Sequence, residues 1–227
     1  MFFDTETNGL ITEDGTIPEL HCICIFDKES NEMHSFYDKD GGNMSETLVG
    51  SAAELLINAH RQNKVVYGFN STQFDLRVMH HHAPVGLKLD IANLTIEHTD
   101  LIADFAARKG YFTSLASLTQ SFGEYKLLDA VESINLWRSG NLARVVEYCA
   151  QDCKLLSMVQ EHIDMYGRYQ RITKASGKVQ FVPVDGYKPW PVANALIQAE
   201  RADTSWMTDP PDVGGLADWA IDILTKP

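Results

Sequence analysis

Short apolar runs separated by polar turns open the chain, a pattern that predicts strands joined by tight connections. We expect strands at residues 2–7, 21–26 and 33–37. The link between the second and third of these is a short polar segment, which is typical of a hairpin. The strands are therefore expected to form an antiparallel meander.

Helical spacing of apolar residues begins after this meander. Apolar positions within residues 45–63 recur at intervals that place them on one face of a helix. The apolar run 64–69 then has the length of a buried strand, and residues 70–79 have the composition of a helix start. This order of elements predicts an α/β fold in which helices cover a sheet.

The second half of the chain is mostly helical in its pattern. A strand or a strand-to-helix junction is expected within residues 94–105. Several helices follow between residues 114 and 172, and the last of them is expected to run from 141 to 172. Residues 178–184 favour a late strand.

Beyond residue 184 the periodicity fades, and prolines and tryptophans become frequent. Trp190, Trp206 and Trp219 are costly to leave in water, so we expect this tail to dock on the rest of the chain. The expected organisation is one domain, residues 1–184, with an appendage, residues 185–227, packed on the same domain.

Charge narrows the classes of partner. The 227 residues carry a formal net charge of −12, with a pI near 5.0. A protein that holds duplex nucleic acid tightly and without sequence preference needs a basic surface, so that class is disfavoured. No apolar run is long enough for a membrane span, and the first residues lack the pattern of a signal peptide. We therefore expect no membrane association.

The cysteines form two close pairs in the sequence: Cys22 with Cys24, and Cys149 with Cys153. Alternate side chains on one face of a strand lie roughly 7 Å apart, which is a poor distance for a disulfide within the first pair. We expect reduced, buried thiols, as in a reducing compartment. A four-cysteine zinc site is the alternative, although these spacings fit no common zinc ribbon.

Two carboxylates interrupt the first predicted strand. Because side chains alternate along a strand, Asp4 and Glu6 project from the same face. Like charges this close repel each other, and a cation between them keeps both ionised. Carboxylate oxygens are the ligands that hard divalent ions such as Mg²⁺ and Mn²⁺ prefer. A solvated strand end is the alternative interpretation of the pair.

Two further acidic elements follow. Asp75 comes directly after Phe74 at the predicted start of a helix, where the helix dipole alone favours an acid. Tyr148 and Asp152 are four residues apart on a long predicted helix, so they project from one face about one turn apart. Each element alone fits an ordinary structural position, but their joint presence favours a shared site.

With these elements the sequence resembles the DEDD exonucleases, in the branch that carries a tyrosine in its last motif. The resemblance covers residue 1 to about residue 170. Residues 123–152 also resemble the bacterial YprB-type predicted exonucleases and related viral or phage enzymes. The residues that match the three motifs, in order, are Asp4, Thr5 and Glu6; Asn70, Phe74 and Asp75; and Tyr148 and Asp152.

The resemblance implies an RNase H-like fold: a mixed five-stranded sheet, an antiparallel meander plus parallel strands, flanked by helices. It also implies two divalent metal ions, Mg²⁺ or Mn²⁺, roughly 4 Å apart. Asp4, Glu6 and Asp152 would hold the inner ion, with Asp4 bridging. Asp75 would hold the outer ion through water.

The implied activity is that of a 3′–5′ exonuclease that releases nucleoside 5′-monophosphates. Tyr148 would orient the water that attacks the terminal phosphodiester. A free phenolate base is not expected, because an ordinary phenol has a pKa of about 10, although metal-borne charge could lower it.

Substrate contacts are also carried over by the resemblance. Leu10 matches the apolar residue that wedges against the terminal base, and Thr5 and Thr7 flank the nucleotide. Asn70 would hydrogen-bond near the sugar or near the scissile end, and Phe74 would support the site. A stacking contact tolerates any base, which fits an enzyme that acts on single-stranded nucleic acid, with DNA favoured over RNA.

Several other polar residues near the motifs have a second interpretation. Lys126, Arg138 and Lys154 could meet phosphates, but a solvated surface cation is the favoured interpretation of each one taken singly. The histidine run 80–82 is not expected to bind a metal, because consecutive residues on a helix face different directions. Asp100 and Asp104 are expected to have structural roles.

Other functions stay open at this point. A phosphatase of the haloacid dehalogenase type also begins with a strand and paired acids, but it needs Asp where Glu6 stands and leaves Tyr148 unexplained. A catalytically silent exonuclease fold could bind nucleic acid or a protein through the tail. An exoribonuclease acting on short RNA would share the motifs. Any polymerase or helicase partner would be a separate chain. The expected location is cytoplasmic, in a bacterium or, for a viral protein, in its host.

Overall fold

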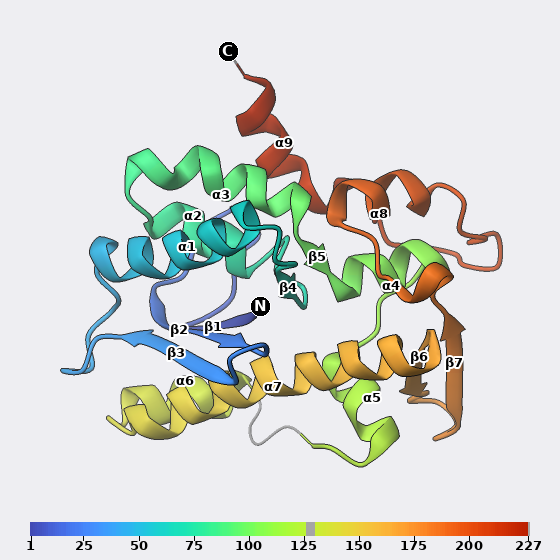
Figure 1. The fold of residues 1–227 in the computed structure, drawn as a ribbon, viewed down its shortest axis with the longest axis horizontal. Coiled ribbons are helices and arrows are strands. Elements are labelled where there is room, and N and C mark those ends of the chain that lie inside the picture. Colours follow the sequence, from blue (N-terminus) through green and yellow to red (C-terminus); the bar gives the residue numbers. More distant parts are fainter. Residues whose placement is uncertain (126–129, 227) are drawn as a thin grey trace.

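A mixed sheet forms the centre of the computed structural model, which describes residues 1–125 and 130–226 (Figure 1). The order of the strands is β3-β2-β1-β4-β5. Strand β1 pairs antiparallel with β2 and parallel with β4, so the expected meander and the expected parallel strands meet at β1. The predicted five-stranded mixed sheet is confirmed. The strands are β1 (Phe2–Thr7), β2 (Leu20–Asp27), β3 (Glu32–Tyr37), β4 (Tyr67–Gly68) and β5 (Thr99–Asp100).

Helices cover both faces of this sheet, and the alternation of side chains along β1 and β2 decides what each face meets. Phe3 and Ile23 pack against α1 (Glu46–Arg61), α2 (Asp75–His82) and α3 (Val85–Glu97). Phe2 and Cys22 point the other way, toward α7 (Leu142–Tyr166). Figure 1 shows α1 to α3 on one side of the strands and α7 on the other. Asp4 and Glu6 therefore belong to the face that meets α7.

Shorter helices complete the layer on the α7 side and link it to the far edge of the sheet. They are α4 (Leu101–Lys109), α5 (Leu115–Thr119), the 3₁₀ turn η1 (Gln120–Phe122) and α6 (Ala130–Arg138). Buried side chains of α4 and α5 share one apolar cluster with α7, which includes Leu101, Phe105 and Leu118. In the part of the chain that the structure describes, no helix is both long and apolar enough to cross a membrane.

Helix α7 ends earlier than the sequence pattern indicates. The expected helix to residue 172 is wrong, because α7 ends at Tyr166 and Gly167 follows with φ +63, a left-handed conformation that stops helices. Residues Arg168–Ile172 instead form β6, which pairs antiparallel with β7 (Val179–Pro183). The strand expected at 64–69 is also shorter, since only Tyr67 and Gly68 make ladder contacts in β4.

The tail beyond β7 lies against α3 and α4. It contains η2 (Asp185–Tyr187), α8 (Val192–Ala199), η3 (Gly214–Ala217) and α9 (Asp218–Thr225). Helix α8 packs on α4 and α9 packs on α3. Trp219 is half-buried and donates its indole N–H to the carbonyl of Thr72 at 2.8 Å. The boundary at residue 184 stays a prediction.

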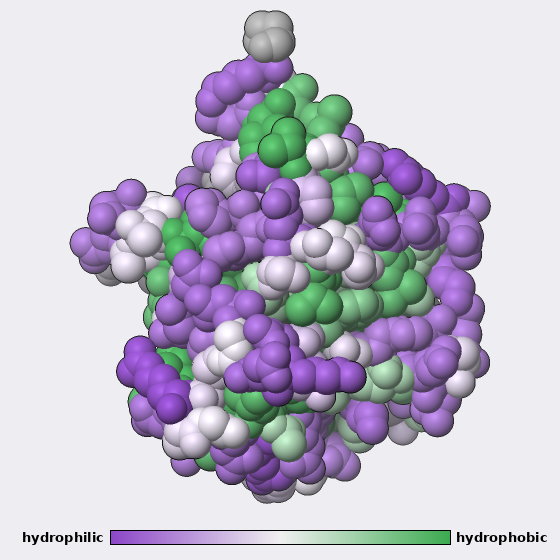
Figure 2. Space-filling view, turned by 90° about the vertical axis from the view of Figure 1, so that its left-hand side faces the viewer, coloured by the Kyte–Doolittle hydropathy of each residue, from purple (hydrophilic) through white to green (hydrophobic). Residues whose placement is uncertain are grey.

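One tryptophan does not follow the expectation that the tail shields its aromatic rings. Trp206 is 66% exposed, whereas Trp190 and Trp219 are half-buried. The ring of Trp206 meets only the edge of Tyr111 among the aromatic contacts of the described residues, with centroids 6.0 Å apart. Figure 2 shows that the face at the α6 end of the molecule is mostly hydrophilic, with apolar atoms gathered toward the C-terminal helix.

Candidate active site

The first strand brings its two carboxylates to the α7 side of the sheet. Glu6 is 9% exposed, and its Oε2 accepts a hydrogen bond of 2.6 Å from the Ser133 hydroxyl of α6. The register between β1 and β2 shifts between Glu6 and Thr7, so the strand is irregular directly after the second acid. The backbone carbonyl of Asp4 accepts from the Cys149 thiol at 3.3 Å, which joins β1 to α7.

Helix α7 places the tyrosine and the last acid of the motifs in the interior. Tyr148 is 3% exposed and Asp152 is 4% exposed, and they lie one turn apart on the same helix. The residue after each of them is a cysteine. The thiol of Cys153 donates to the carbonyl of Cys24 on β2 at 3.2 Å, as Cys149 does to Asp4. Small side chains at these positions let α7 approach the strands closely.

The middle motif lies in a turn that returns tightly to the sheet. Asn70 has φ +62, a left-handed conformation that asparagine tolerates better than most residues. Gly68 precedes it, and a Cβ there would lie 2.0 Å from the Ser71 Oγ, so only glycine allows this approach. Asp75 then begins α2 with 4% of its surface exposed.

Strand β5 fixes this turn from the side. The carboxylate of Asp100 accepts from the backbone N–H groups of Asn70 and Thr72, both at 2.9 Å. It also caps α4 by accepting from the N–H of Ile102 at 3.1 Å. The buried ring of His98 contacts the Ser71 hydroxyl at 2.8 Å. The expected structural role of Asp100 is confirmed, and that role is to hold the turn that carries Asp75.

Asp75 is linked directly to the first motif. The hydroxyl of Thr5 donates a hydrogen bond of 2.6 Å to its Oδ1, and both groups are buried. Burial raises the pKa of Asp75 to about 7, with the nearby charge of Asp100 adding to the rise and the Thr5 hydrogen bond opposing it. A carboxyl group with this pKa is poised to change charge near neutral pH, and a neighbouring cation would hold it ionised.

The acids of the three motifs influence one buried thiol. The pKa of Cys153 is raised well above its ordinary value by burial first, and then by the charges of Cys24, Asp4, Asp152 and Asp75. Carboxylates from β1, α2 and α7 therefore all act on the same buried group, although they are far apart in the sequence. Glu6 is held by a separate hydrogen bond from Ser133.

The residues expected to touch substrate are more dispersed. Leu10 is 72% exposed in the segment after β1, and Asn70 is exposed in its turn. Phe74 is half-buried and packs on the apolar cluster of α1 to α3. Thr5 donates to Asp75, and the Thr7 hydroxyl donates to the carbonyl of Gly9 at 2.6 Å.

The remaining polar candidates do not converge on this site. Arg138 and Lys154 are exposed, and Lys126 lies outside the described residues. The histidines of α2 turn to different partners, with His80 against the ring of Trp219 and His82 against the carbonyl of Pro18. All four cysteines are buried and reduced, as expected.

The donor set suits a hard cation by its chemistry, although no ready-made site is present. Among residues 1–125 and 130–226, no three His, Cys, Asp or Glu side chains are placed to hold a metal ion. Asp4, Glu6, Asp75 and Asp152 offer only oxygen donors, which Mg²⁺ and Mn²⁺ prefer. The neighbouring thiols of Cys149 and Cys153 have raised pKa values and donate to backbone carbonyls, so they stay protonated.

Comparison with known families agrees with this architecture. The RNase_H_2 family model, described as RNase_H superfamily, matches residues 1–164. The chain therefore belongs to the RNase H superfamily, which consists largely of nucleases and other hydrolases. Membership indicates a nuclease-type activity, and nucleases of this superfamily generally use divalent metals. No curated protein matches the chain significantly. Membership of this superfamily is not compatible with the alternative of a phosphatase of the haloacid dehalogenase type.

Two supporting residues escaped the sequence interpretation. Ser133 bonds Glu6 from a helix more than a hundred positions away, and no local spacing marks it. His98 is a lone histidine in the sequence, and only the fold brings it to Ser71. Neither a motif nor a periodicity would have found them, because their partners lie on other elements.

Proposed function

We propose that this chain is a 3′–5′ exonuclease that removes nucleoside 5′-monophosphates from the 3′ end of single-stranded nucleic acid, with DNA favoured over RNA. The observation that carries the proposal is the buried hydrogen bond from Thr5 to Asp75, which joins the first motif to the middle one within an RNase H-superfamily domain. The Cys149 thiol joins α7, which carries Asp152, to the backbone of Asp4. Tyr148, one helical turn from Asp152, completes the set.

The carboxylates have a shared task in this proposal. Asp4, Glu6 and Asp152 would hold one divalent cation and Asp75 a second, Mg²⁺ or Mn²⁺ in each case. When bound, such cations supply positive charge at the scissile phosphate. Ser133 and Thr5 orient Glu6 and Asp75 by the hydrogen bonds that each donates. Glu6 and Asp75 are thus each restrained by a hydrogen bond in the folded chain.

Two uncharged side chains, those of Tyr148 and Leu10, orient the attacking water and the terminal base. The buried phenol of Tyr148 orients a water for in-line attack on the terminal phosphorus. The bond from this phosphorus to the 3′ oxygen of the penultimate nucleotide breaks. The products are a strand that is one nucleotide shorter and a nucleoside 5′-monophosphate. Leu10, which is exposed beside β1, packs against the terminal base.

The test measures the shortening of 5′-labelled single strands, as DNA and as RNA, with Mg²⁺, with Mn²⁺ and with EDTA. We expect metal-dependent, stepwise loss from the 3′ end, absent in Asp152→Asn. Asp164→Asn is the matched control, because Asp164 is exposed three turns further along the same helix. Its activity should equal that of the unaltered chain.

Each other outcome points elsewhere. No shortening of either strand with either metal would contradict the proposal and favour a silent fold that binds nucleic acid or protein. Faster loss from RNA than from DNA, above all from short RNA, would make the chain an exoribonuclease. If Asp164→Asn also loses activity, the loss in Asp152→Asn reflects a general disturbance of α7 and says nothing specific about the carboxylate of Asp152.

A further inference from the structure

The hairpin of β6 and β7 concentrates positive charge in an otherwise acidic chain. Residues 168–183 contain Arg168, Arg171, Lys174 and Lys178 and no Asp or Glu, while the whole chain has a formal net charge of −12. Figure 1 shows this hairpin at the C-terminal end of α7, on the side of the molecule away from α6. It follows residue 164, where the family match ends.

A cavity of about 630 Å³ lies between the hairpin, the end of α4 and the tail. Arg171 and Gln180 line it from the two strands, Lys109 and Tyr111 from the end of α4, and Trp206 from the tail. The Tyr111 hydroxyl donates to the Gln180 side chain at 3.2 Å, which ties the wall of α4 to the hairpin. The cavity thus combines cations with aromatic rings.

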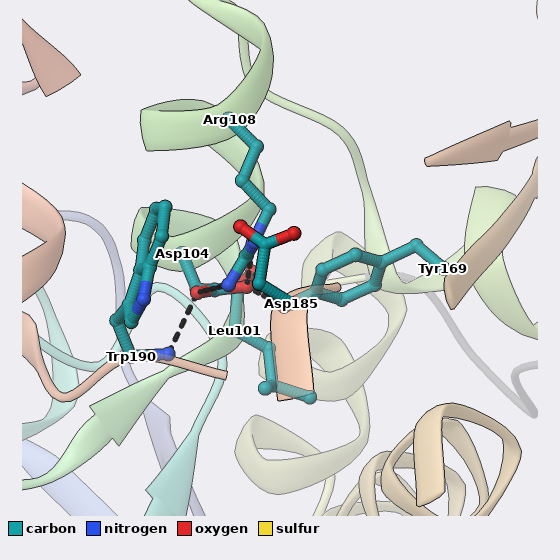
Figure 3. A network of polar contacts seen from close by, with 6 residues as sticks. All are labelled: Leu101, Asp104, Arg108, Tyr169, Asp185 and Trp190. Atoms are coloured by element: carbon teal, nitrogen blue, oxygen red, sulfur yellow. Dashed lines mark hydrogen bonds and ion pairs between the residues drawn. The ribbon is translucent and has the colours of Figure 1, made fainter. Parts of the chain in front are cut away.

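One wall of this cavity is rigid and already neutral. Figure 3 shows Arg108 and Asp104 at the centre of a polar network. Two nitrogens of Arg108 donate to Asp104 at 3.0 Å, and the guanidinium lies 3.7 Å from the ring centre of Trp190. The Tyr169 hydroxyl and the Trp190 backbone N–H also donate to Asp104, at 2.6 and 2.7 Å. Arg108 therefore supports the wall and adds no free charge.

The other two cations of the cavity are available for an anion. Within the described residues, neither Lys109 nor Arg171 has a carboxylate at ion-pair distance. The Nε of Arg171 is buried and has no acceptor in that part of the chain, an arrangement that a bound phosphate oxygen would correct. The guanidinium lies 5.2 Å from the ring centre of Tyr111, which holds it in place.

Trp206 gives this charged cavity an exposed aromatic face. Its indole N–H donates to the carbonyl of Asp203 at 3.0 Å, and its ring stands at 79° to Tyr111. The carboxylate of Asp203, the acid among the lining residues, is engaged by the backbone and hydroxyl of Ser205. An exposed indole beside free cations is the combination that proteins use to hold single-stranded nucleic acid.

We infer that this cavity is a second binding site for single-stranded nucleic acid, in which Arg171 and Lys109 hold a phosphate and a base stacks on Trp206. The inference rests on the proposed function, since it gives the same enzyme a hold on the strand away from the cleaved end. From Asp152 to Tyr166, α7 rises by about 21 Å. A stacked strand covers that length in roughly six nucleotides, so a strand of about four nucleotides is too short to reach along α7 from Asp152 to the hairpin.

The test is a binding measurement on the full chain carrying Asp152→Asn, so that strands stay intact. Labelled single-stranded DNA of about four and of about twenty nucleotides is titrated, on a length scale set by the spacing of phosphates. We expect Arg171→Gln and Lys109→Gln each to weaken binding of the long strand about tenfold and to reduce its salt slope by about 0.7. Trp206→Ala should also weaken it about tenfold. The short strand cannot occupy both sites at once, so the advantage in affinity of the long strand over the short one should shrink in each of these variants.

Controls separate charge, fold and activity. Lys39→Gln removes one charge from an exposed site outside the cavity and should leave binding unchanged. Arg171→Lys keeps the charge and should recover most of the affinity lost in Arg171→Gln. If the long strand binds Arg171→Gln, Lys109→Gln and Trp206→Ala as tightly as the parent chain, the inference is wrong. If the unaltered chain shortens no strand, the proposed function is wrong. The binding measurements on the cavity variants do not depend on cleavage, so they still decide whether the cavity binds single strands.

Discussion

The acidic site and the cationic cavity are built in opposite ways. The acidic site lies within the matched residues 1–164 and holds buried carboxylates, each of Glu6, Asp75 and Asp152 being at most 9% exposed. The cationic cavity is built from α4, the β6–β7 hairpin and the tail, and its aromatic face is open to water. The acidic site keeps its carboxylates away from water, whereas the cavity leaves the indole of Trp206 exposed. The formal net charge of −12 for the whole chain therefore hides a local excess of cations at the hairpin.

The largest effect should come from the acidic site. Asp152→Asn removes one charge from the cluster while keeping the volume of the side chain. Stabilisation of transition-state charge at a metal site amounts to several kcal/mol, so we expect hydrolysis to fall by about a thousandfold. Single-turnover rates on labelled strands measure this. A loss of less than about tenfold would remove Asp152 from the catalytic group.

The pH dependence of the free energy of unfolding can show whether burial raises the pKa of Asp75. Its pKa is about 7 in the fold against about 3.9 for an ordinary aspartate, so the folded chain binds the proton more tightly than the unfolded chain. Stability from this group is full below about pH 4 and is lost as the pH rises through about 7. In EDTA, the loss should reach about 4 kcal/mol relative to Asp75→Asn.

Urea unfolding at several pH values measures this difference, and added Mg²⁺ should reduce it by favouring the ionised carboxylate. If unaltered chain and Asp75→Asn respond identically to pH in EDTA, the carboxyl group is not perturbed by its surroundings. Asp164→Asn serves again as the control, because Asp164 is exposed on α7.

On the other side of the comparison, Asp104 should matter for stability and not for catalysis. Asp104→Ala leaves Arg108, whose side chain is 6% exposed, without its buried partner, and we expect a loss of about 3 kcal/mol in the free energy of unfolding. Asp222→Ala breaks an exposed pair with Lys226 and should change little. If folded Asp104→Ala loses as much turnover as Asp152→Asn, Asp104 also matters for catalysis, and the expected difference between the two regions is wrong.

The smallest effect is expected at the rim of the acidic site. Leu10→Ala shortens a side chain that is 72% exposed, so stability should stay within error. Loss of one stacking contact should reduce kcat/KM for single strands by about fivefold. Val85→Ala, at an exposed position on α3, is the matched control. Equal effects of the two changes would leave Leu10 without a role at the terminal base.

How far the sequence determined these conclusions differs from element to element. The meander and the helix after it followed from periodicity, because each strand and helix there buries one regular face. The end of α7 did not, because Gly167 stops the helix although apolar residues continue along the chain into β6. Trp206 is exposed although its hydrophobic side chain predicts burial, and the structure places it at the cavity beside the hairpin.

For the candidate site, the sequence indicated the acids but not what holds them. Asp4, Asp75 and Asp152 were recognisable by their order and by the elements beneath them. The bonds from Ser133 to Glu6 and from Asp100 to the turn at Asn70 link residues that are distant in the chain. Such pairs leave no periodic trace, so only the fold can reveal them.

The thiols beneath α7 set the spacing between this helix and the sheet. Cys149 and Cys153 donate to the carbonyls of Asp4 and Cys24 at 3.3 and 3.2 Å, so sulfur atoms are the spacers between helix and sheet. The separation of the strand that carries Asp4 from the helix that carries Asp152 is therefore governed by the size of two cysteine side chains. A bulkier residue at either position would push the helix away from the strand, and with it one acid of the candidate site away from the other.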